Sequence, residues 1–528
     1  MQTELLQDEE FDVIVAGAGM GGAIAAARIA QFGVNPRNGE KLKIALFEWG
    51  PYYKGDALRG YGIAGRRGAF DGMPYELERR YMLPWGTLGL VGGASHWAGM
   101  IAYPPTPIDF EHWRAETDVD WTWEKFNLPL AELYEMWHPY PEPKEVRSPG
   151  QERFREAALA VGYDVGEMGQ AKLNCPRCGD CNGRFCKYDA KSNAMTTYIP
   201  IAERYGVRIV PQAAVDKIVI EKKGSRPAAT GVHYRLNGEM RRARAANVIV
   251  SCGYNGTARL LYRSGYGPRN KVQGELFAEN RNVGSNVIAT ISARHIEAWF
   301  DEPLKHPDVG VHTVYYVEKV GHHGYNRLGV AESFGTREGT GDFPPDHALS
   351  EIAPHFGREF KEYMKQSGTH IGNIRIEMSK TGIRGEVNTD GQAVFGGVPN
   401  IRGGSETGLR LEYLQKNHPE VLEGFHEGHE IGRKIVNYMK PRKVYGPDQG
   451  IGERFTLNQP LGSCRAGAST ENSVVNSDLE SHDVDNLFIS DGSVVPVQGT
   501  CNPTMPIAAI CNHGWRRIVA KHFSRGGA

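Results

Sequence analysis

The N-terminal part of the chain carries the pattern that most restricts the fold. An apolar run at 11–16 has the composition of a short buried strand, and the glycine-rich segment 17–22 follows it directly. Residues 23–30 are strong helix formers, and a second apolar run, 42–48, ends in an acid, Glu48. A strand, a glycine turn, a helix and a second strand in this order form the unit that binds a dinucleotide. The sequence therefore predicts a Rossmann-type unit.

The residues of this turn have separate geometric roles. Gly17 permits a tight turn, Gly19 lets the backbone approach a pyrophosphate, and Gly22 lets the helix pack closely on the sheet. The N-terminus of the helix offers free N–H groups and a partial positive charge to the phosphates. Glu48 is expected to bind the ribose hydroxyls, which disfavours a 2′-phosphate there.

The remaining strands of this fold are spread along the chain. Apolar runs predict strands over 206–210, 214–221, 247–252 and 486–490. A glycine turn and a helix over 256–262 follow the third of these runs. A final helix is expected after Asn502, with Pro503 in its first turn, where a missing N–H is tolerated. Pieces of one nucleotide-binding fold therefore stand at the beginning, middle and end of the sequence.

Size and charge exclude several classes of protein. A chain of 528 residues exceeds one hydrophobic core. Its formal net charge of −1 gives no reason to expect nucleic acid or an anionic membrane as a partner. The N-terminus is acidic, and no apolar run approaches the ~18 residues that cross a bilayer. We expect a cytoplasmic protein, or a periplasmic one exported already folded by a signal-bearing partner, with no direct membrane span.

Five segments in order resemble the signatures of the glucose–methanol–choline (GMC) oxidoreductases over nearly the whole chain. They are the turn 17–22 with Glu48, the glycine-rich loop 91–99, and the segments 248–265, 282–286 and 487–504. The resemblance implies an FAD-binding α/β protein (α+β overall). A Rossmann-type FAD-binding domain built from discontinuous segments would stand beside a substrate domain with a mostly antiparallel sheet.

This resemblance also suggests domain limits. The expected FAD-binding domain comprises 8–100, 201–290 and 451–525, with a cap and cysteine-cluster segment at 101–200 and a substrate domain at 291–450. Aromatic residues on the substrate side are candidates for stacking on a sugar, or else ordinary core residues: Trp113, Trp121, Trp123, Tyr315 and Tyr316.

The family's chemistry implies two catalytic positions, and one of them departs from the pattern. Relatives pass a carbinol hydrogen to flavin N5 as hydride while a base, usually a histidine paired with a second histidine or an asparagine, removes the hydroxyl proton. Asn502 matches the second position, but Gln459 stands where the first histidine is expected. An amide cannot accept a proton near neutral pH. Either another residue or a water is the base, or the reaction is not ordinary alcohol oxidation.

Other histidines are weak substitutes. His513 lies well into the final helix, roughly 15 Å along it from Pro503 at 1.5 Å per residue. The substrate side offers four more: His312, His322, His323 and His370.

Further cofactor contacts follow from the same resemblance. Gly92, Gly93 and His96 lie in the expected flavin loop, and Val215 and Asp491 are also expected to contact FAD. Some relatives attach the flavin covalently through a histidine followed by Trp, and others hold it non-covalently. For His96, covalent attachment, non-covalent contact and simple packing all remain open.

Four cysteines crowd into one loop. Cys175, Cys178, Cys181 and Cys186 have the spacing C-x2-C-x2-C-x4-C. Near neighbours pair poorly as unstrained disulfides, and structural zinc more often uses two separated C-x2-C knuckles. The spacing favours an iron–sulfur cluster, 3Fe–4S or 4Fe–4S, over zinc, disulfides or free thiols.

Three functions fit the sequence. The first is an FAD- and iron–sulfur-dependent dehydrogenase of a sugar, glycoside or polyol, as in bacterial relatives whose cluster exports electrons. Its external acceptor would be a separate cytochrome or small subunit, because the chain has no haem-attachment motif. The second is an oxygen-using oxidase or a dehydrogenase of an apolar alcohol, such as a sterol or long-chain alcohol. The third, motivated by Gln459, is a non-redox flavin-dependent lyase or isomerase.

Overall fold

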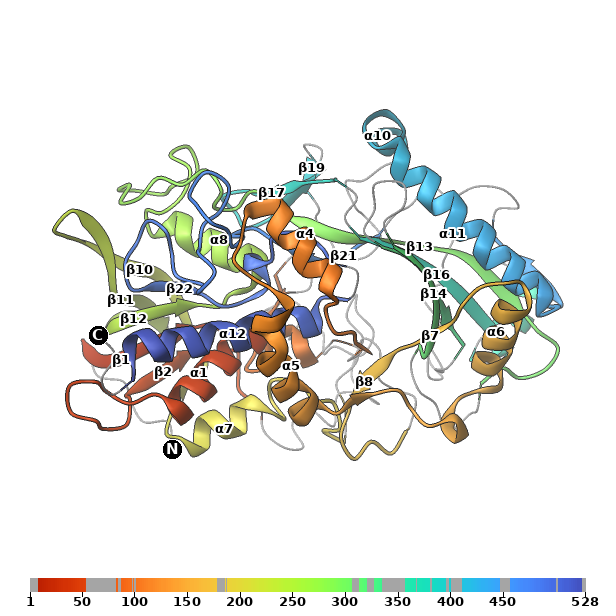
Figure 1. Ribbon diagram of the computed structural model, residues 1–528, viewed down its shortest axis with the longest axis horizontal. Helices are drawn as coiled ribbons and strands as arrows, with labels where there is room; N and C mark the ends of the chain where they lie inside the picture. The colour runs from red at the N-terminus through yellow and green to blue at the C-terminus, as the bar shows by residue number, and fades with distance from the viewer. Residues whose placement is uncertain are drawn as a thin grey trace.

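Two large sheets lie at opposite ends of the long axis in this computed structural model (Figure 1). The structure describes residues 8–53, 82–83, 87–96, 98, 101–177, 186, 188–305, 313–320, 327–334, 357–366, 368–379, 382–395, 398–399, 411–446, 456–499 and 502–524. Among the helices in these ranges, none has the length and apolar character needed to span a bilayer.

The first sheet is mixed and draws its strands from distant parts of the chain. Its order is β10 (Ala213–Lys223), β11 (Arg226–Leu236), β12 (Glu239–Val250), β1 (Glu9–Ala16), β2 (Ile44–Phe47) and β9 (Arg208–Val210), with β22 (Leu487–Ile489) paired to β12. The pairs that involve β1, β2, β9 and β22 are parallel, whereas β10, β11 and β12 form an antiparallel meander. A parallel core with apolar strands needs helices on its faces.

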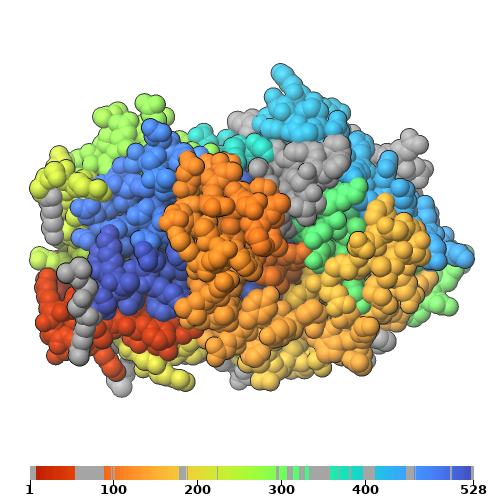
Figure 2. Space-filling model, viewed as in Figure 1, coloured from red at the N-terminus to blue at the C-terminus, as the bar shows by residue number. Residues whose placement is uncertain are grey.

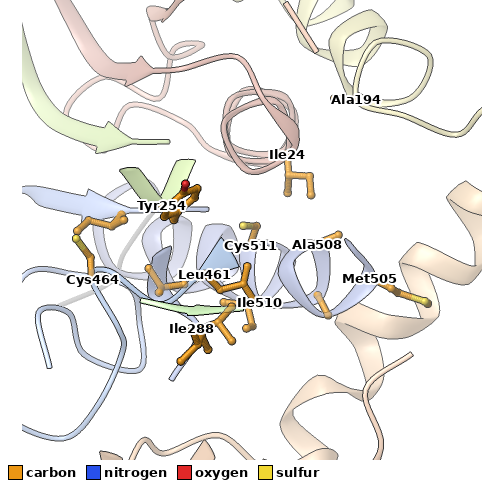
Figure 3. Packing of buried hydrophobic residues seen from close by; sticks show 14 of the residues in the cluster. Ile24, Ala194, Tyr254, Ile288, Leu461, Cys464, Met505, Ala508, Ile510 and Cys511 are labelled. Carbon is orange, nitrogen blue, oxygen red and sulfur yellow. The ribbon is translucent and has the colours of Figure 1, made fainter. Parts of the chain in front are cut away.

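Helices from the beginning, middle and end of the chain pack on this sheet or on one another beside it. They are α1 (Met20–Phe32), α7 (Tyr198–Arg204), α8 (Gly253–Arg263) and α12 (Thr504–His522). Figure 3 shows Cys511 and Ala508 of α12 on the side of Ile24 in α1, with Leu461 and Ile288 across the helix. The last helix is thus buried between the nucleotide-binding layer and the beginning of the second sheet.

The second sheet is antiparallel. Its order is β20 (Lys443–Tyr445), β13 (Ile288–Trp299), β16 (Ile371–Ser379), β15 (Arg327–Ser333), β14 (Tyr315–Val320) and β7 (Gly166–Glu167), with β21 (Thr456–Leu461) paired to β13. All of these pairs are antiparallel. The long helix α11 (Pro419–Tyr438) packs on one face, where Gly428 lies against Ile376. One face is therefore covered by helix, and the other is available for a site.

A helical segment lies between the two sheets. Figure 2 shows it in orange across the middle of the visible face. It contains α4 (Pro107–Thr117), α5 (Trp123–Trp137) and the small sheet β5 (Ile101–Ala102), β8 (Gly169–Ala171) and β6 (Pro139–Tyr140), and α6 (Pro149–Ala160) follows. Trp113 and Trp121 are only 1% and 0% exposed, so these two are core residues and do not stack on a sugar.

The shorter elements complete the description. They are β3 (Met82–Leu83), β4 (Thr87–Leu88), η2 (Gly93–His96), η3 (Lys144–Val146), α9 (Gly357–Gln366), β17 (Gly385–Val387), β18 (Ala393–Phe395), β19 (Val398–Pro399), α10 (Leu411–Asn417) and η5 (Gly492–Val494).

The predicted fold class is confirmed: a Rossmann-type layer assembled from discontinuous segments stands beside an antiparallel sheet. Two local predictions need correction. The strand expected at 247–252 is the end of the much longer β12, because its N-terminal half pairs with β11 as a hairpin. Pro503 is the residue before α12, and its first turn begins at Thr504. The residue limits of the domains stay a prediction.

Candidate cofactor and substrate site

The turn after β1 is closely packed. Gly17 has φ +104°, and a Cβ there would overlap the Ser251 carbonyl oxygen. A Cβ on Gly22 would overlap the Gly17 carbonyl oxygen, and one on Gly21 would overlap that of Ser490. Bare backbone at these positions lets α1 approach β1, β12 and β22 closely. Gly21 was not singled out in the sequence, because its neighbour comes from the far end of the chain.

Gly19, by contrast, faces open space. A Cβ on Gly19 would meet no atom of the described residues within 4 Å, and Gly19 is the N-cap of α1. A Cβ on Gly93 would lie 2.9 Å from the Gly19 Cα, and the Gly92 N–H donates to the Ala18 carbonyl at 2.8 Å. The two predicted glycine-rich elements are therefore in contact beside the helix N-terminus. Open space, unpaired helix N–H groups and small residues fit the pyrophosphate of FAD.

Glu48 closes the other side of the turn. Its Oε2 accepts from the Ala18 N–H and its Oε1 from the Gly50 N–H, both at 3.0 Å. Burial raises the pKa of this carboxyl, and the backbone donors oppose that rise. The carboxylate is thus fixed at the end of β2, next to the turn, as its predicted role toward a ribose requires.

His96 turns back onto its own loop. Its Nε2 donates to the Val91 carbonyl oxygen at 3.0 Å. Burial lowers the pKa of His96 to about 4, so the ring is neutral near pH 7. Lys191 donates to the carbonyls of His96, at 3.2 Å, and Ala98, at 2.8 Å. Nε2 is thus engaged by the backbone, and covalent attachment, non-covalent flavin contact and simple packing of His96 all stay untested predictions.

Asp491 is used by the protein itself. Its Oδ2 accepts from the Gly253 N–H at 2.9 Å and the Thr257 hydroxyl at 2.6 Å, and its Oδ1 accepts from the Ser493 N–H at 2.8 Å. The side chain therefore joins β22, α8 and η5. Val215 lies in β10, opposite Tyr234 and next to an irregularity in the strand pairing. The contacts of Asp491 and Val215 with FAD stay predictions.

Gln459 lies at a β-bulge. Ile288 pairs with Leu461 and Thr290 with Asn458, so Gln459 and Pro460 face one residue of β13. Gln459 has φ +55°, and such bulges re-aim a side chain beside active sites. The Thr290 hydroxyl donates to Gln459 Oε1 at 3.3 Å and accepts from Gln498 Nε2 at 3.0 Å. The chain of donors therefore runs from Gln498 through Thr290 to Gln459.

Asn502 opens onto a small pocket that Thr290 shares. The pocket is lined by Thr290, Arg327, Glu377, Met378, Ser379 and Asn502. Thr290 thus connects the two predicted catalytic positions, Gln459 and Asn502. No sequence pattern pointed to Arg327, Glu377 or Gln498. The register of the second sheet brings Arg327 and Glu377 to this place, whereas Gln498 comes from the segment after η5.

The alternative histidines that the structure describes lie in other surroundings. His513 is buried, stacks on Phe126 with ring centroids 4.8 Å apart, and has its pKa lowered by burial to about 4. His370 contacts the Thr369 hydroxyl through Nδ1 at 2.8 Å. His312, His322 and His323 lie outside the described residues.

The cysteine loop begins and ends on paired backbone. The Leu173 N–H donates to the Ala190 carbonyl at 2.8 Å, and Lys172 pairs with Lys191. The sulfurs of Cys175 and Cys186 each accept a backbone N–H at 3.3 Å, from Arg177 and Ala190 respectively. Cys178 and Cys181 lie outside the described residues, and the part that is described holds no metal-ligating cluster. The iron–sulfur assignment stays a prediction.

Several known proteins are similar to this chain. A long-chain-alcohol oxidase of Arabidopsis thaliana is 22% identical over 94% of this chain and 66% of its own length. A gluconate 2-dehydrogenase flavoprotein of Pantoea cypripedii is 25% identical over 74% of this chain and 65% of its own length. The matches therefore span slightly less than two thirds of both relatives. Oxygen-dependent choline dehydrogenase 1 of Chromohalobacter salexigens is 24% identical over 96% of this chain and 94% of its own length.

Solved structures and family models agree with these matches. The pyridoxine 4-oxidase of Mesorbium loti superposes with a TM-score of 0.69 at 16% identity, over 96% of this chain and 98% of that one. A formate oxidase superposes with a TM-score of 0.66 at 15% identity, over 98% and 99%. At such identities these structures support the fold alone. The family model GMC oxidoreductase matches residues 11–291, and its C-terminal counterpart matches 409–511. The chain belongs to the GMC oxidoreductase family.

Proposed function

We propose that this protein is an FAD-dependent dehydrogenase that oxidises a hydroxyl of a sugar, glycoside or polyol. The kinds of side chain that line the small pocket shared by Thr290 and Asn502 support this proposal. Of the six described residues that line the pocket, five carry a polar side chain, and Met378 is the exception. A sterol or long-chain alcohol needs an apolar pocket, because buried polar groups without partners are costly. Neighbouring hydroxyls of a sugar would instead pair with Arg327, Glu377 and Asn502.

The residues fit FAD at the Rossmann layer. Gly17, Gly19 and Gly22 would hold its pyrophosphate, Glu48 its ribose, and Gly92 and Gly93 its flavin side. FAD, when bound, accepts a hydride from the substrate carbon. The chain's own residues bind and orient the alcohol. The donor chain from Gln498 through Thr290 fixes the Gln459 amide, so that its NH2 group can face a substrate oxygen.

We also propose that electrons leave through an iron–sulfur cluster to an external acceptor, a cytochrome or small subunit. Two observations support this path. The root of the cysteine loop is joined to the expected flavin loop, because Lys191 pairs with Lys172 and donates to the His96 carbonyl. The sulfurs of Cys175 and Cys186 accept backbone N–H groups, as cluster thiolates do. One similar protein is named a gluconate 2-dehydrogenase flavoprotein.

The test is anaerobic bleaching of the flavin by candidate substrates. Sugars, glycosides and polyols are expected to reduce the bound FAD, and an artificial acceptor is expected to reoxidise it faster than oxygen does. Bleaching only by sterols or long-chain alcohols, with peroxide formed in air, would instead identify an oxidase of apolar alcohols. Turnover of a compound without any acceptor would identify a lyase or isomerase.

Replacing Cys175 or Cys186 by alanine is expected to remove iron and sulfide from anaerobically purified protein. Because the cysteines lie outside the FAD-binding turn, FAD content and substrate-driven bleaching should persist, while transfer to the acceptor falls by at least about tenfold. Metal analysis and a visible spectrum measure the first effect. The control is Cys511→Ala, which removes a buried thiol from α12. Iron retained in both loop variants would contradict the cluster.

Replacing Gln459 by histidine is expected to lower turnover about fivefold to tenfold. The φ of +55° at this position tolerates histidine, so the backbone should persist. The Thr290 hydroxyl would lose its amide acceptor. A lost hydrogen bond costs about 1 kcal/mol, and that energy corresponds to the expected fall in turnover. Thr290→Val breaks the same bond from the other side and should have a similar effect. A rise in turnover in Gln459→His would show instead that the amide is a weakened histidine site.

A further inference from the structure

One row of the second sheet holds two carboxylates separated by a glycine. Glu377 of β16 lies opposite Gly329 of β15, and Glu318 of β14 lies on the other side of Gly329. Ser292 of β13 continues the row beyond Glu377. Residues directly opposite each other in antiparallel strands share a face of the sheet. Because Gly329 has no side chain, the space between the two carboxylates is open to a neighbour.

Arg327 fills that space. A Cβ built on Gly329 would lie 3.2 Å from the Arg327 Cζ, so the guanidinium group lies over the glycine. Its Nε donates to Glu318 Oε2 at 2.9 Å. The rings of Tyr103 and Tyr316 lie 5.0 and 5.2 Å from the Arg327 Cζ. Arg327 is thereby held by Glu318 and two aromatic rings.

Glu377 has a different environment. Its Oε1 lies 3.4 Å from Arg375 Nη1, and its side chain is 13% exposed. It lines the pocket together with Asn502 and Thr290, whereas Glu318 does not. Among the described residues, the charged groups that face Glu377 are Arg375 on its own strand and Arg327 on β15, with Glu318 beyond Arg327.

Among the described residues that line the pocket, Glu377 alone can accept a proton near neutral pH. Thr290 and Ser379 carry hydroxyls, Asn502 an amide and Met378 a thioether, while Arg327 stays protonated. Gln459, at the position that usually carries the base, is an amide as well. The proton acceptor missing from β21 therefore has a candidate on β16, in the pocket lined by Thr290, whose hydroxyl donates to Gln459.

We propose that Glu377 is the base that takes the substrate's hydroxyl proton in this protein. The inference rests on the proposed function, because it needs an alcohol in this pocket. The O–H bond breaks and its proton goes to the Glu377 carboxylate. The carbinol C–H bond breaks and its hydrogen leaves with both electrons as hydride to FAD, so that the C–O bond becomes C=O. The partly exposed carboxyl then returns the proton to water.

The experiment compares three variants of the FAD-loaded protein, with a sugar or polyol that reduces the wild type. Glu377→Gln keeps the shape and removes the proton acceptor, so the anaerobic rate of flavin reduction should fall at least about 100-fold. Glu377→Asp keeps a carboxylate and should recover part of the rate. Glu318→Gln removes a carboxylate from the same row outside the pocket. Its anaerobic rate of flavin reduction should fall less than about tenfold.

Two further readouts separate a base from a residue that only binds or shapes the pocket. The fall of kcat/KM toward acid pH should be present in the wild type and Glu318→Gln and absent in Glu377→Gln. Substrate affinity of FAD-free protein, measured by calorimetry, should change less than about tenfold in Glu377→Gln.

Each outcome has one meaning. Rates of Glu377→Gln within tenfold of wild type, or an unchanged acid limb, would overturn the assignment of Glu377. If the substrate affinity of Glu377→Gln falls as much as its rate of flavin reduction, the assignment is overturned as well, because Glu377 would then bind the substrate without acting as the base. A wild type that no sugar or polyol reduces would contradict the proposed function itself, and this is seen before any variant is made.

Discussion

Gly22→Ala is expected to leave a protein that does not retain FAD through purification. The added methyl would overlap the Gly17 carbonyl oxygen, which belongs to rigid backbone at the end of β1. To relieve the overlap, α1 must move away from the sheet, and such overpacking costs typically about 1–3 kcal/mol. The same movement displaces the helix N-terminus from the place where a pyrophosphate would bind. Bound FAD is measured by absorbance after denaturation and stability by thermal unfolding of FAD-free protein.

The matched control adds the same methyl three residues earlier. Gly19 has φ −71° and ψ −172°, a conformation that alanine adopts without strain, and its Cβ would meet no atom within 4 Å in the part of the chain that the structure describes. The free energy of unfolding of Gly19→Ala should therefore lie within about 0.5 kcal/mol of the wild-type value. Its methyl points into the space proposed for the pyrophosphate, so FAD affinity should fall about tenfold or more. Wild-type FAD affinity in Gly19→Ala would mean that the phosphates bind elsewhere.

The glycine turn of the expected FAD-binding site could be recognised from the sequence. A strand, a glycine turn and a helix are contiguous, so their geometry follows from local rules. The role of Gly21 could not be foreseen, because a Cβ there would overlap the Ser490 carbonyl oxygen, far away in sequence. Sequence alone could name the turn but not everything that packs on it.

The side chains around the proposed substrate pocket are brought together by the register between strands of the second sheet, which the sequence does not reveal. Gln459 was recognised by its departure from a family pattern, but its bulge and its contact with Thr290 follow from the pairing of β13 with β21. Arg327 and Glu377 share a pocket because β15 and β16 pair in one register, and a slip of one residue would turn Glu377 to the other face. No short-range pattern in the sequence fixes such a register.

The position of Asp491 could be predicted from the sequence, but its hydrogen-bond partners could not. The family resemblance marked it as a cofactor contact, and it does lie at the carboxyl end of β22, beside the Rossmann layer. Its carboxylate, however, accepts three hydrogen bonds from the chain itself. A signature residue of this kind can therefore serve the cofactor indirectly, by fixing the elements around it.

Asp491→Ala is accordingly expected to destabilise the protein by about 3–5 kcal/mol, since it leaves the buried donors of Gly253, Thr257 and Ser493 without their acceptor. The loss should appear as a lower melting temperature in FAD-free protein as well as in the loaded form. Asp491→Asn keeps one acceptor oxygen, so its melting temperature should fall less than that of Asp491→Ala. If FAD-free Asp491→Ala melts like the wild type while FAD affinity falls, then the carboxylate acts on the cofactor directly and its contacts to α8 and η5 contribute little to stability.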